Sequence, residues 1–490
     1  MPDNRSKNWL KIGCIGFVAL LCLLGLGTFG YLKYRVGQKA SRLPELLAKL
    51  KAKGIATEPV DFYQGAAVDK DKNAASLYSQ IATKIEEIRK TNEPSAVGEA
   101  LGNLTFKRYL DDDVLIAQGL KNRKEIFQLA EEAAKRPNCN FGYDLSEASS
   151  VTFPQLSYMK NTARWLAVRA KAQANAGDFD GALSSIRTAF AIVNHLSQQP
   201  MLIGALVAFA ANVNAIVGLE QVTIIGRNNP AYLAKARALL ESLPPLPDLK
   251  LAFSGEMVLG RYSIEKLRSW KEFESAYSGD YVNGPTTPTP IDNLTLGDPE
   301  VRKMYEAQYV ELWSEVFDKF PANPDDWKPL VDTMQAINDR ISKDDSMENK
   351  INRILFPLFG ETAKSRATAL ALRRVALTSI RLLQDRATKG LPKDLSGYGP
   401  SAIDPMDGKP LRIRVLNKGF KVWSIDRDLV DDGGLKYIPN TGMNLEKKDL
   451  VWGFDYPFPS PPAPKGYGAE VFKPHGGGGP PLMTRPPTLD

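Results

Sequence analysis

The chain reads Ala163-Arg-Trp-Leu-Ala-Val-Arg-Ala170, then Asn175-Ala-Gly-Asp-Phe-Asp-Gly-Ala182, then Ala189-Phe-Ala-Ile-Val193, and this stretch decides the fold. Apolar residues recur at helical intervals on both sides of Gly177-Asp178-Phe179, which predicts two helices joined by a tight turn. Small residues stand where the two helices must approach closely: Ala170, Gly177, Ala182 and Ala189. We therefore expect a helical hairpin here.

This hairpin resembles one unit of a tetratricopeptide repeat. Only one such unit is convincing, whereas a stable solenoid needs about three or more repeats. We therefore expect a repeat-like hairpin inside a larger α-helical domain. Two interpretations of its surface stay open, a peptide-binding groove or plain helix packing.

Helical periodicity dominates the chain on both sides of the hairpin. The expected helices are Leu43 to Ile55, Asp113 to Lys135, Ala231 to Leu243, Leu251 to Tyr277, Glu300 to Phe320, Trp327 to Ser342 and Glu361 to Thr388. The sequence thus predicts a mainly α fold, with a helical body at 61–389 and a loop at 278–299. A juxtamembrane helix and linker at 33–60 precede this body.

An uncharged run of 21 residues, Ile12 to Leu32, follows a short basic N-terminal tail (1–11). At about 1.5 Å per residue it spans a hydrocarbon core of about 30 Å, so we expect a transmembrane helix at 12–32. The run is longer than the core of a typical cleaved signal peptide and no small-x-small site follows it, which favours a signal anchor. We expect a single-pass protein of the inner (cytoplasmic) membrane with its body outside the cytoplasm, although the dense positive charge after the segment argues for the opposite orientation.

Leu196 to Leu219 is a second stretch without charge. Two asparagines, Asn212 and Asn214, lie within it, and small residues are frequent. This composition fits a helix buried on all sides in a protein core better than a second membrane span.

A small β module is expected at 390–456. Asp404-Pro405 and Asp407-Gly408 are turn formers, and alternating apolar residues on both sides of Asn417-Lys-Gly419 predict a hairpin of two strands. Residues 457–490 contain 10 prolines and 6 glycines, so we expect a disordered tail.

Four carboxylates gather after the second strand of this module, at Asp426, Asp428, Asp431 and Asp432, and Gly433-Gly434 follows them. Several carboxylates in a glycine-containing loop suit Ca²⁺, which prefers oxygen ligands in flexible geometry. The spacing is not that of an EF-hand, because Tyr437 stands where a closing Glu is needed. Calcium is therefore one interpretation, and solvated aspartates that cap turns are the other.

Gly390-Leu-Pro392, Asp404-Pro-Met-Asp-Gly-Lys-Pro-Leu411, Gly419-Phe-Lys-Val-Trp-Ser424 and Asp431-Asp-Gly-Gly434 resemble the C-terminal signature of a group of uncharacterised, membrane-anchored bacterial envelope proteins. The signature is also similar to the C-terminal β region of type II secretion pseudopilins, and that resemblance implies calcium in the acidic loop. The chain departs from pseudopilins at Gly16-Phe17, which leads to Leu21 where their processing site has Glu. We therefore do not expect a pilus subunit.

Few residues suggest catalysis. His195 lies on an apolar helix, His475 lies in the tail, and the lone Cys139 outside the membrane run is expected to be a buried small hydrophobe. Glu256, Arg261 and Glu265 are expected to form an internal ion-pair group.

The net charge of +7 comes partly from the flanks of the membrane run, and no nucleic-acid motif is present, so no nucleic-acid partner is expected. The function expected is interaction or scaffolding with protein partners at the membrane, in association with secretion or pilus-like machinery. The alternative is an envelope hydrolase with a carboxylate-based site in the helical body.

Overall fold

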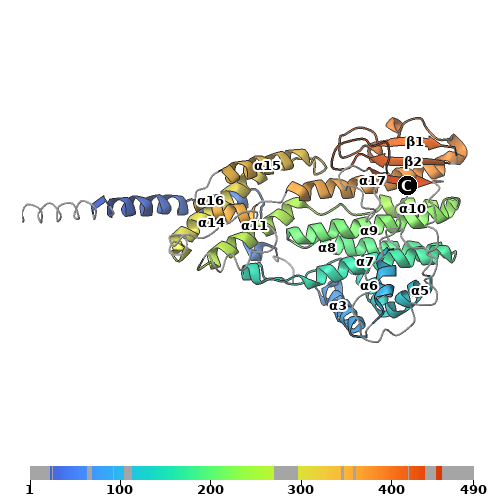
Figure 1. The fold of residues 1–490 in the computed structure, drawn as a ribbon, viewed down its shortest axis with the longest axis horizontal. Helices are drawn as coiled ribbons and strands as arrows, with labels where there is room; N and C mark the ends of the chain where they lie inside the picture. The colour runs from blue at the N-terminus through green and yellow to red at the C-terminus, as the bar shows by residue number, and fades with distance from the viewer. Residues whose placement is uncertain are drawn as a thin grey trace, which may run out of the picture.

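The fold is known from a computed structural model, which describes residues 23–62 except 25, 69–91, 93–103, 113–269, 296–343, 347–356, 360–417, 419–435 and 449–454. Three predictions fall wholly or largely outside these ranges: most of the transmembrane helix at 12–32, the loop at 278–299 except its last residues, and the tail at 457–490. Residues 23–24 and 26–40 form the N-terminal helix. Figure 1 shows this helix, in dark blue, leading away from the rest of the protein.

The described part is mainly helical, as predicted. Its helices are α2 (Leu43–Ala52), α3 (Ala75–Lys90), α4 (Ser95–Asn103), α5 (Asp113–Asn122), α6 (Lys124–Ala133), α7 (Pro154–Asn175), α8 (Phe179–Ser197), α9 (Leu202–Gly226), α10 (Pro230–Glu241), α11 (Leu249–Lys266), α14 (Pro299–Asp318), α15 (Lys328–Lys343), α16 (Met347–Leu355) and α17 (Gly360–Lys389). Short 3-10 turns join several of them, at Pro59–Phe62, Lys70–Lys72, Leu145–Ser150, Ser396–Tyr398 and Pro400–Ala402.

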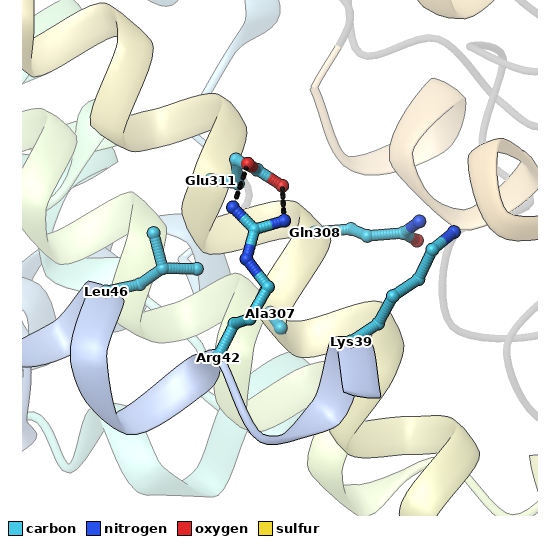
Figure 2. Close-up of a pocket in the computed structure, with 6 residues that line it drawn as sticks. All are labelled: Lys39, Arg42, Leu46, Ala307, Gln308 and Glu311. Atoms are coloured by element: carbon cyan, nitrogen blue, oxygen red, sulfur yellow. Dashed lines mark hydrogen bonds and ion pairs between the residues drawn. The ribbon is translucent and has the colours of Figure 1, made fainter. Parts of the chain in front are cut away.

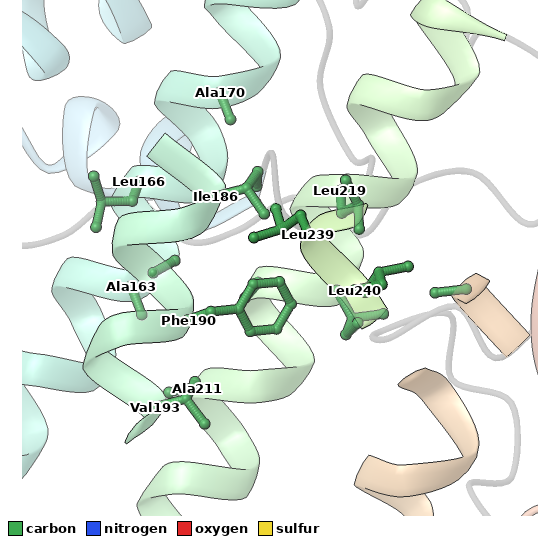
Figure 3. Close-up of a cluster of buried hydrophobic side chains, with 14 of the residues drawn as sticks. Ala163, Leu166, Ala170, Ile186, Phe190, Val193, Ala211, Leu219, Leu239 and Leu240 are labelled. Carbon is green, nitrogen blue, oxygen red and sulfur yellow. The ribbon is translucent and has the colours of Figure 1, made fainter. Parts of the chain in front are cut away.

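The predicted hairpin is formed by α7 and α8. Gly177 makes the turn with a φ of 83°, a conformation that favours glycine. The Asp178 side chain then caps α8, because its Oδ1 accepts the N–H of Gly181 at 2.8 Å. Figure 3 shows the apolar cluster between these helices and their neighbours, to which Leu166, Ile186 and Phe190 belong.

The long helix α9 packs against both helices of the hairpin. A Cβ on Gly218 would lie 2.6 Å from Cβ of Ala167 on α7, so the close approach requires a glycine. Among the residues that the structure describes, α9 alone is long and apolar enough to cross a membrane, and 67% of its most apolar window is buried. The predicted single element at Leu196 to Leu219 is wrong in its bounds, because α8 ends at Ser197 and α9 begins at Leu202.

Two other predicted helices also differ from the structure. Asp113 to Lys135 is divided into α5 and α6 at Arg123, whose buried guanidinium pairs with Glu93 at 2.8 Å and donates to the Gly119 carbonyl. The helix expected at Leu251 to Tyr277 ends at Lys266, and Leu267 is extended.

The C-terminal module is an antiparallel sheet of three strands in the order β1-β2-β3: β1 (Arg412–Leu416), β2 (Gly419–Ser424) and β3 (Leu450–Phe454). Val422 in the central strand pairs with Ile413 on one side and Trp452 on the other. The sheet packs on α17, and its residues Phe420, Val422 and Trp452 belong to the same apolar cluster as residues of α7, α8 and α9. The module is thus continuous with the core of the body.

Candidate functional site

The acidic loop follows β2 and lies at one end of the module. Its base is fixed by Asp404, which is fully buried. The Asp404 carboxylate accepts the N–H of Met406 (3.0 Å), the Ser424 hydroxyl (2.8 Å) and the N–H of Ile425 (3.1 Å), and it pairs with Arg412. The motif that begins at Asp404 therefore ties its own turn to the end of β2, just before the acidic loop begins.

The first two aspartates of the predicted calcium set hold the chain in position. Asp426 has a φ of 51°, and its Oδ1 accepts the hydroxyl of Thr368 on α17 at 3.0 Å. Burial raises the pKa of Asp426, and Thr368 and Arg427 partly offset this effect. Asp428 is exposed and accepts the N–H of Val430 at 3.1 Å, as a turn-capping aspartate does.

The last two aspartates of the set lie at the other end of the loop. Asp431 accepts the indole N–H of Trp423 at 2.8 Å and the N–H of Gly433 at 2.9 Å. Its second oxygen lies 3.7 Å from Nε of Arg412. Asp432 is half-buried, and its Oδ2 has no hydrogen-bond partner.

Asp449, which sequence reasoning missed, closes this end of the loop from the start of β3. It is 1% exposed, and its Oδ2 accepts the N–H of Gly434 at 2.7 Å, whereas its Oδ1 has no partner. Burial, reinforced by the negative charges of Asp431 and Asp432, raises the pKa of Asp449 to about 6. The structure thus brings Asp431, Asp432 and Asp449 near one another, while Asp426 is engaged by α17.

A lysine of the protein already occupies part of this loop. Lys421 of β2 is 4% exposed, and its Nζ donates to the carbonyl oxygens of Gly433 (2.6 Å) and Gly434 (2.9 Å). Backbone carbonyl oxygens of this kind are common calcium ligands, and Lys421 already donates to both of them. Among the described residues no group of three or more His, Cys, Asp or Glu side chains is arranged to hold a metal. What the loop does offer is two buried carboxylate oxygens without partners.

The histidine and the cysteine of the body both lie in its core. His195 is 1% exposed, with Nδ1 2.7 Å from the Tyr78 hydroxyl and Nε2 2.8 Å from the Arg136 carbonyl. Cys139 is 2% exposed, and burial raises the pKa of its thiol far above the ordinary value, so it is not a reactive thiolate. Both residues are buried, and for Cys139 this confirms the prediction.

The ion-pair group predicted from Glu256, Arg261 and Glu265 has different members. Arg261 on α11 pairs with Glu306 of α14 at 2.6 Å and with Glu58 at 3.0 Å. Glu256 is half-buried and accepts the N–H of Leu202 at the start of α9, and burial raises its pKa to about 7. Sequence spacing could not identify Glu306, because it lies 45 residues after Arg261.

A small hollow lies where the N-terminal helix meets the body. Figure 2 shows its lining, which comes from the end of this helix, the start of α2 and the middle of α14. The residues are Lys39, Arg42, Leu46, Ala307, Gln308 and Glu311, and the cavity volume is about 130 Å³. That volume is well below the ~300–1,000 Å³ of pockets that enclose whole small-molecule ligands.

The resemblance of the C-terminal module to envelope proteins and pseudopilins stays a prediction from its motifs. The geometry explains one of these motifs, because Asp404 holds the turn against the end of β2. No family model matches the chain, and no curated protein or solved structure matches it significantly.

Proposed function

We propose that this chain is a single-pass membrane protein of the cell envelope that acts in protein interaction or scaffolding, with residues 12–32 as its anchor. The observation that carries the proposal is the exposure of apolar side chains in the C-terminal part of that segment, which the structure describes. Leu23, Leu24, Leu26, Phe29 and Leu32 are 57–69% exposed on a helix that continues into the body. Burying one such side chain is worth about 1.5–3 kcal/mol, and a bilayer provides this burial.

Helix α9 supports a single anchor, because its Asn212 has a partner inside the body. Asn212 accepts a hydrogen bond from Nε of Arg373 at 2.7 Å and is fully buried. Its apolar residues belong to the two large apolar clusters of the body, with Leu219 in the cluster of Figure 3 and Leu202 in a second cluster.

The C-terminal module supports the interaction part of the proposal. Three of its apolar side chains are at least half exposed, Val415 (52%), Val430 (50%) and Leu435 (55%). In the described part of the chain β1 pairs with β2 alone, so the other edge of β1 has backbone groups available for a partner. Val415 lies on this edge strand, and an exposed apolar residue on an open strand edge is typical of protein-binding surfaces.

The anchor is tested by removing residues 1–35. This cut keeps Val36 and Ala40, which pack on the body. We expect the truncated protein to leave the membrane fraction and to stay monodisperse without detergent, and its helical circular dichroism signal should fall only by the contribution of the helical residues that were removed. As a matched control, the full chain should stay in the pellet after alkaline carbonate extraction. A truncated protein that still needs detergent would refute the single-anchor topology.

A cation site in the acidic loop is a second candidate function. It is favoured by the two oxygens without partners, Asp432 Oδ2 and Asp449 Oδ1, because a buried polar atom without a partner is costly. The competing explanation is that the two carboxylates share a proton, which the raised pKa of Asp449 allows.

Thermal melts at pH 7.5 with calcium and with chelator distinguish the two explanations. If the loop binds calcium, the ion should raise the Tm by several degrees, and Asp449→Asn should abolish this increase while Asp428→Asn retains it. If the carboxylates share a proton, Asp449→Asn should itself raise the Tm and calcium should have no effect. If wild type has the same Tm with calcium and with chelator, the loop does not bind calcium and the cation-site hypothesis is refuted.

The hydrolase alternative has weaker support. Glu306 is held by Arg261, and Glu256 accepts a backbone N–H, so each of these two acids has a structural partner. Neither acid lines the hollow of Figure 2.

A further inference from the structure

The junction between the N-terminal helix and the body is strongly basic. Lys33, Arg35, Lys39 and Arg42 follow the apolar run, and the chain has no acidic residue between Asp3 and Glu45. Lys33, Arg35 and Arg42 are exposed, and Lys39 is half-buried against the body. We call these four residues the basic junction.

Helix geometry places the first half of the basic junction, Lys33 and Arg35, at the depth of lipid headgroups, given the anchor proposed above. Lys39 is seven residues beyond Leu32, which is about 10 Å along a helix axis. The headgroup layer on each side of a bilayer is about 5–8 Å thick. Lys33 therefore lies within this layer, and the long Lys39 side chain can extend back to its outer edge.

The aromatic residues beside the basic junction fit the same depth. Tyr31 is 61% and Tyr34 is 62% exposed. Tyrosine is enriched at membrane–water interfaces, because its ring is apolar and its hydroxyl remains hydrated. Together with the four cations, these rings mark the level at which the chain leaves the bilayer.

The hollow adds a shaped polar contact to this charge. Lys39 on the N-terminal helix and Gln308 on α14 extend in the same direction along its edge, as Figure 2 shows. Arg42 is oriented beside them by Glu311, whose Oε1 lies 2.7 Å from its guanidinium. The hollow is lined by two cations, an amide and the Glu311 carboxylate that pairs with Arg42, and its volume of about 130 Å³ suits a phosphate group better than a bulky ligand.

We propose that the basic junction binds the phosphodiester headgroups of anionic phospholipids, with one headgroup held at the hollow by Lys39 and Gln308. The inference rests on the proposed anchor and adds a lipid class to it. Each basic residue near an anionic surface contributes about 1 kcal/mol, which is roughly fivefold in affinity. Binding of these headgroups holds the helical body against the membrane surface, so that the body does not move freely at the end of its anchor.

The test uses the full chain in detergent and counts bound lipids by native mass spectrometry, with phosphatidylglycerol and phosphatidylcholine at equal concentration. We expect wild type to retain phosphatidylglycerol at least about tenfold over phosphatidylcholine. The variant Lys33→Gln/Arg35→Gln/Lys39→Gln/Arg42→Gln should lose this preference. A control with the same change in charge on exposed lysines elsewhere should keep it: Lys90→Gln, Lys235→Gln, Lys393→Gln and Lys409→Gln.

The outcomes separate this proposal from the anchor itself. Both variants should stay in the membrane fraction, because the apolar run is unchanged, and a soluble full chain would refute the anchor. A junction variant that keeps its lipid preference overturns the headgroup site while leaving the anchor intact. If 10 mM inorganic phosphate removes the bound lipid as well as the junction substitutions do, the site recognises free phosphate and the lipid assignment is wrong.

Discussion

His195 is held between an acceptor and a donor in the core of the body. The Arg136 carbonyl can only accept, so Nε2 carries the proton and Nδ1 accepts the hydroxyl proton of Tyr78. Burial lowers the pKa of His195 below its usual 6.5, and the hydrogen bond to Arg136 only partly offsets this effect. The folded protein therefore keeps this imidazole neutral.

This neutral imidazole predicts a loss of stability in mild acid. Because the folded pKa lies below the unfolded one, the unfolded chain binds a proton that the folded chain excludes, and the free energy of unfolding decreases as pH falls through 6.5. The slope from one such group is at most about 1.4 kcal/mol per pH unit. Urea unfolding of the full chain in detergent, repeated between pH 8 and pH 5, measures how the free energy of unfolding changes with pH.

The chain has two histidines, which provides a matched control. His195→Gln should weaken the pH dependence between pH 7 and pH 5 and lower the stability at pH 8. His475→Gln should leave both unchanged. If the His195→Gln curve runs parallel to that of wild type, this histidine is not the source of the acid sensitivity.

The acidic loop shows what sequence reasoning can and cannot predict about single residues. Proximity in the chain predicts that the four aspartates act together, yet Asp426 is engaged by Thr368 of α17. Asp449 joins Asp431 and Asp432 through the pairing of β3 with β2. Its one sequence signal is an acidic residue directly before the apolar run that begins at Leu450.

At the scale of elements, α11 crosses the turn between α8 and α9 with almost no space between them. A Cβ built on Gly255 of α11 would lie 1.5 Å from the carbonyl oxygen of Pro200. That atom belongs to the backbone, so rotation of a side chain cannot relieve the contact. The packing of these helices therefore depends on this glycine.

We expect Gly255→Ala to destabilise the protein by about 3 kcal/mol or more, because overpacking against backbone must shift a whole helix. The matched control is Gly98→Ala on α4, where nothing lies within 4 Å of the new Cβ. Alanine there should stabilise the helix by up to about 1 kcal/mol. Chemical denaturation of both variants measures the difference, and a mild effect at Gly255 would contradict the close packing.

Helix positions were predictable from periodicity, whereas their breaks were not. The hairpin of α7 and α8 and the long α17 follow directly from apolar spacing and turn residues. The break at Arg123 depends on Glu93, which is 30 residues away, so no local pattern indicates it. The sequence does not predict β3, because this strand pairs with β2 but begins only at Leu450, long after β2 ends at Ser424.

At the scale of the whole molecule, two large apolar cores share two helices, and a smaller apolar cluster joins α4 and α5 to Val168 of α7. One core gathers α3, α6, α7, α8, α10 and the sheet, and the other gathers α2, α11, α14, α15 and α16. Helices α9 and α17 contribute to both, with Phe209 and Ala367 in one and Ala215 and Val375 in the other. The described part of the chain should therefore unfold as one cooperative unit.

The C-terminal module belongs to that unit, which predicts unequal effects of two truncations. Deleting 390–490 removes Phe420, Val422 and Trp452 from the core that they share with α17 and uncovers the part of α17 that packs on β2 and β3. Each lost contact of this size is worth about 1.5–3 kcal/mol, so the Tm should fall by ten degrees or more and the protein should aggregate. Deleting only 457–490 leaves all three strands intact, and its Tm should match that of the full chain. Differential scanning fluorimetry with size-exclusion chromatography compares the two, and a stable, monodisperse 1–389 fragment would show that the body folds independently of its sheet.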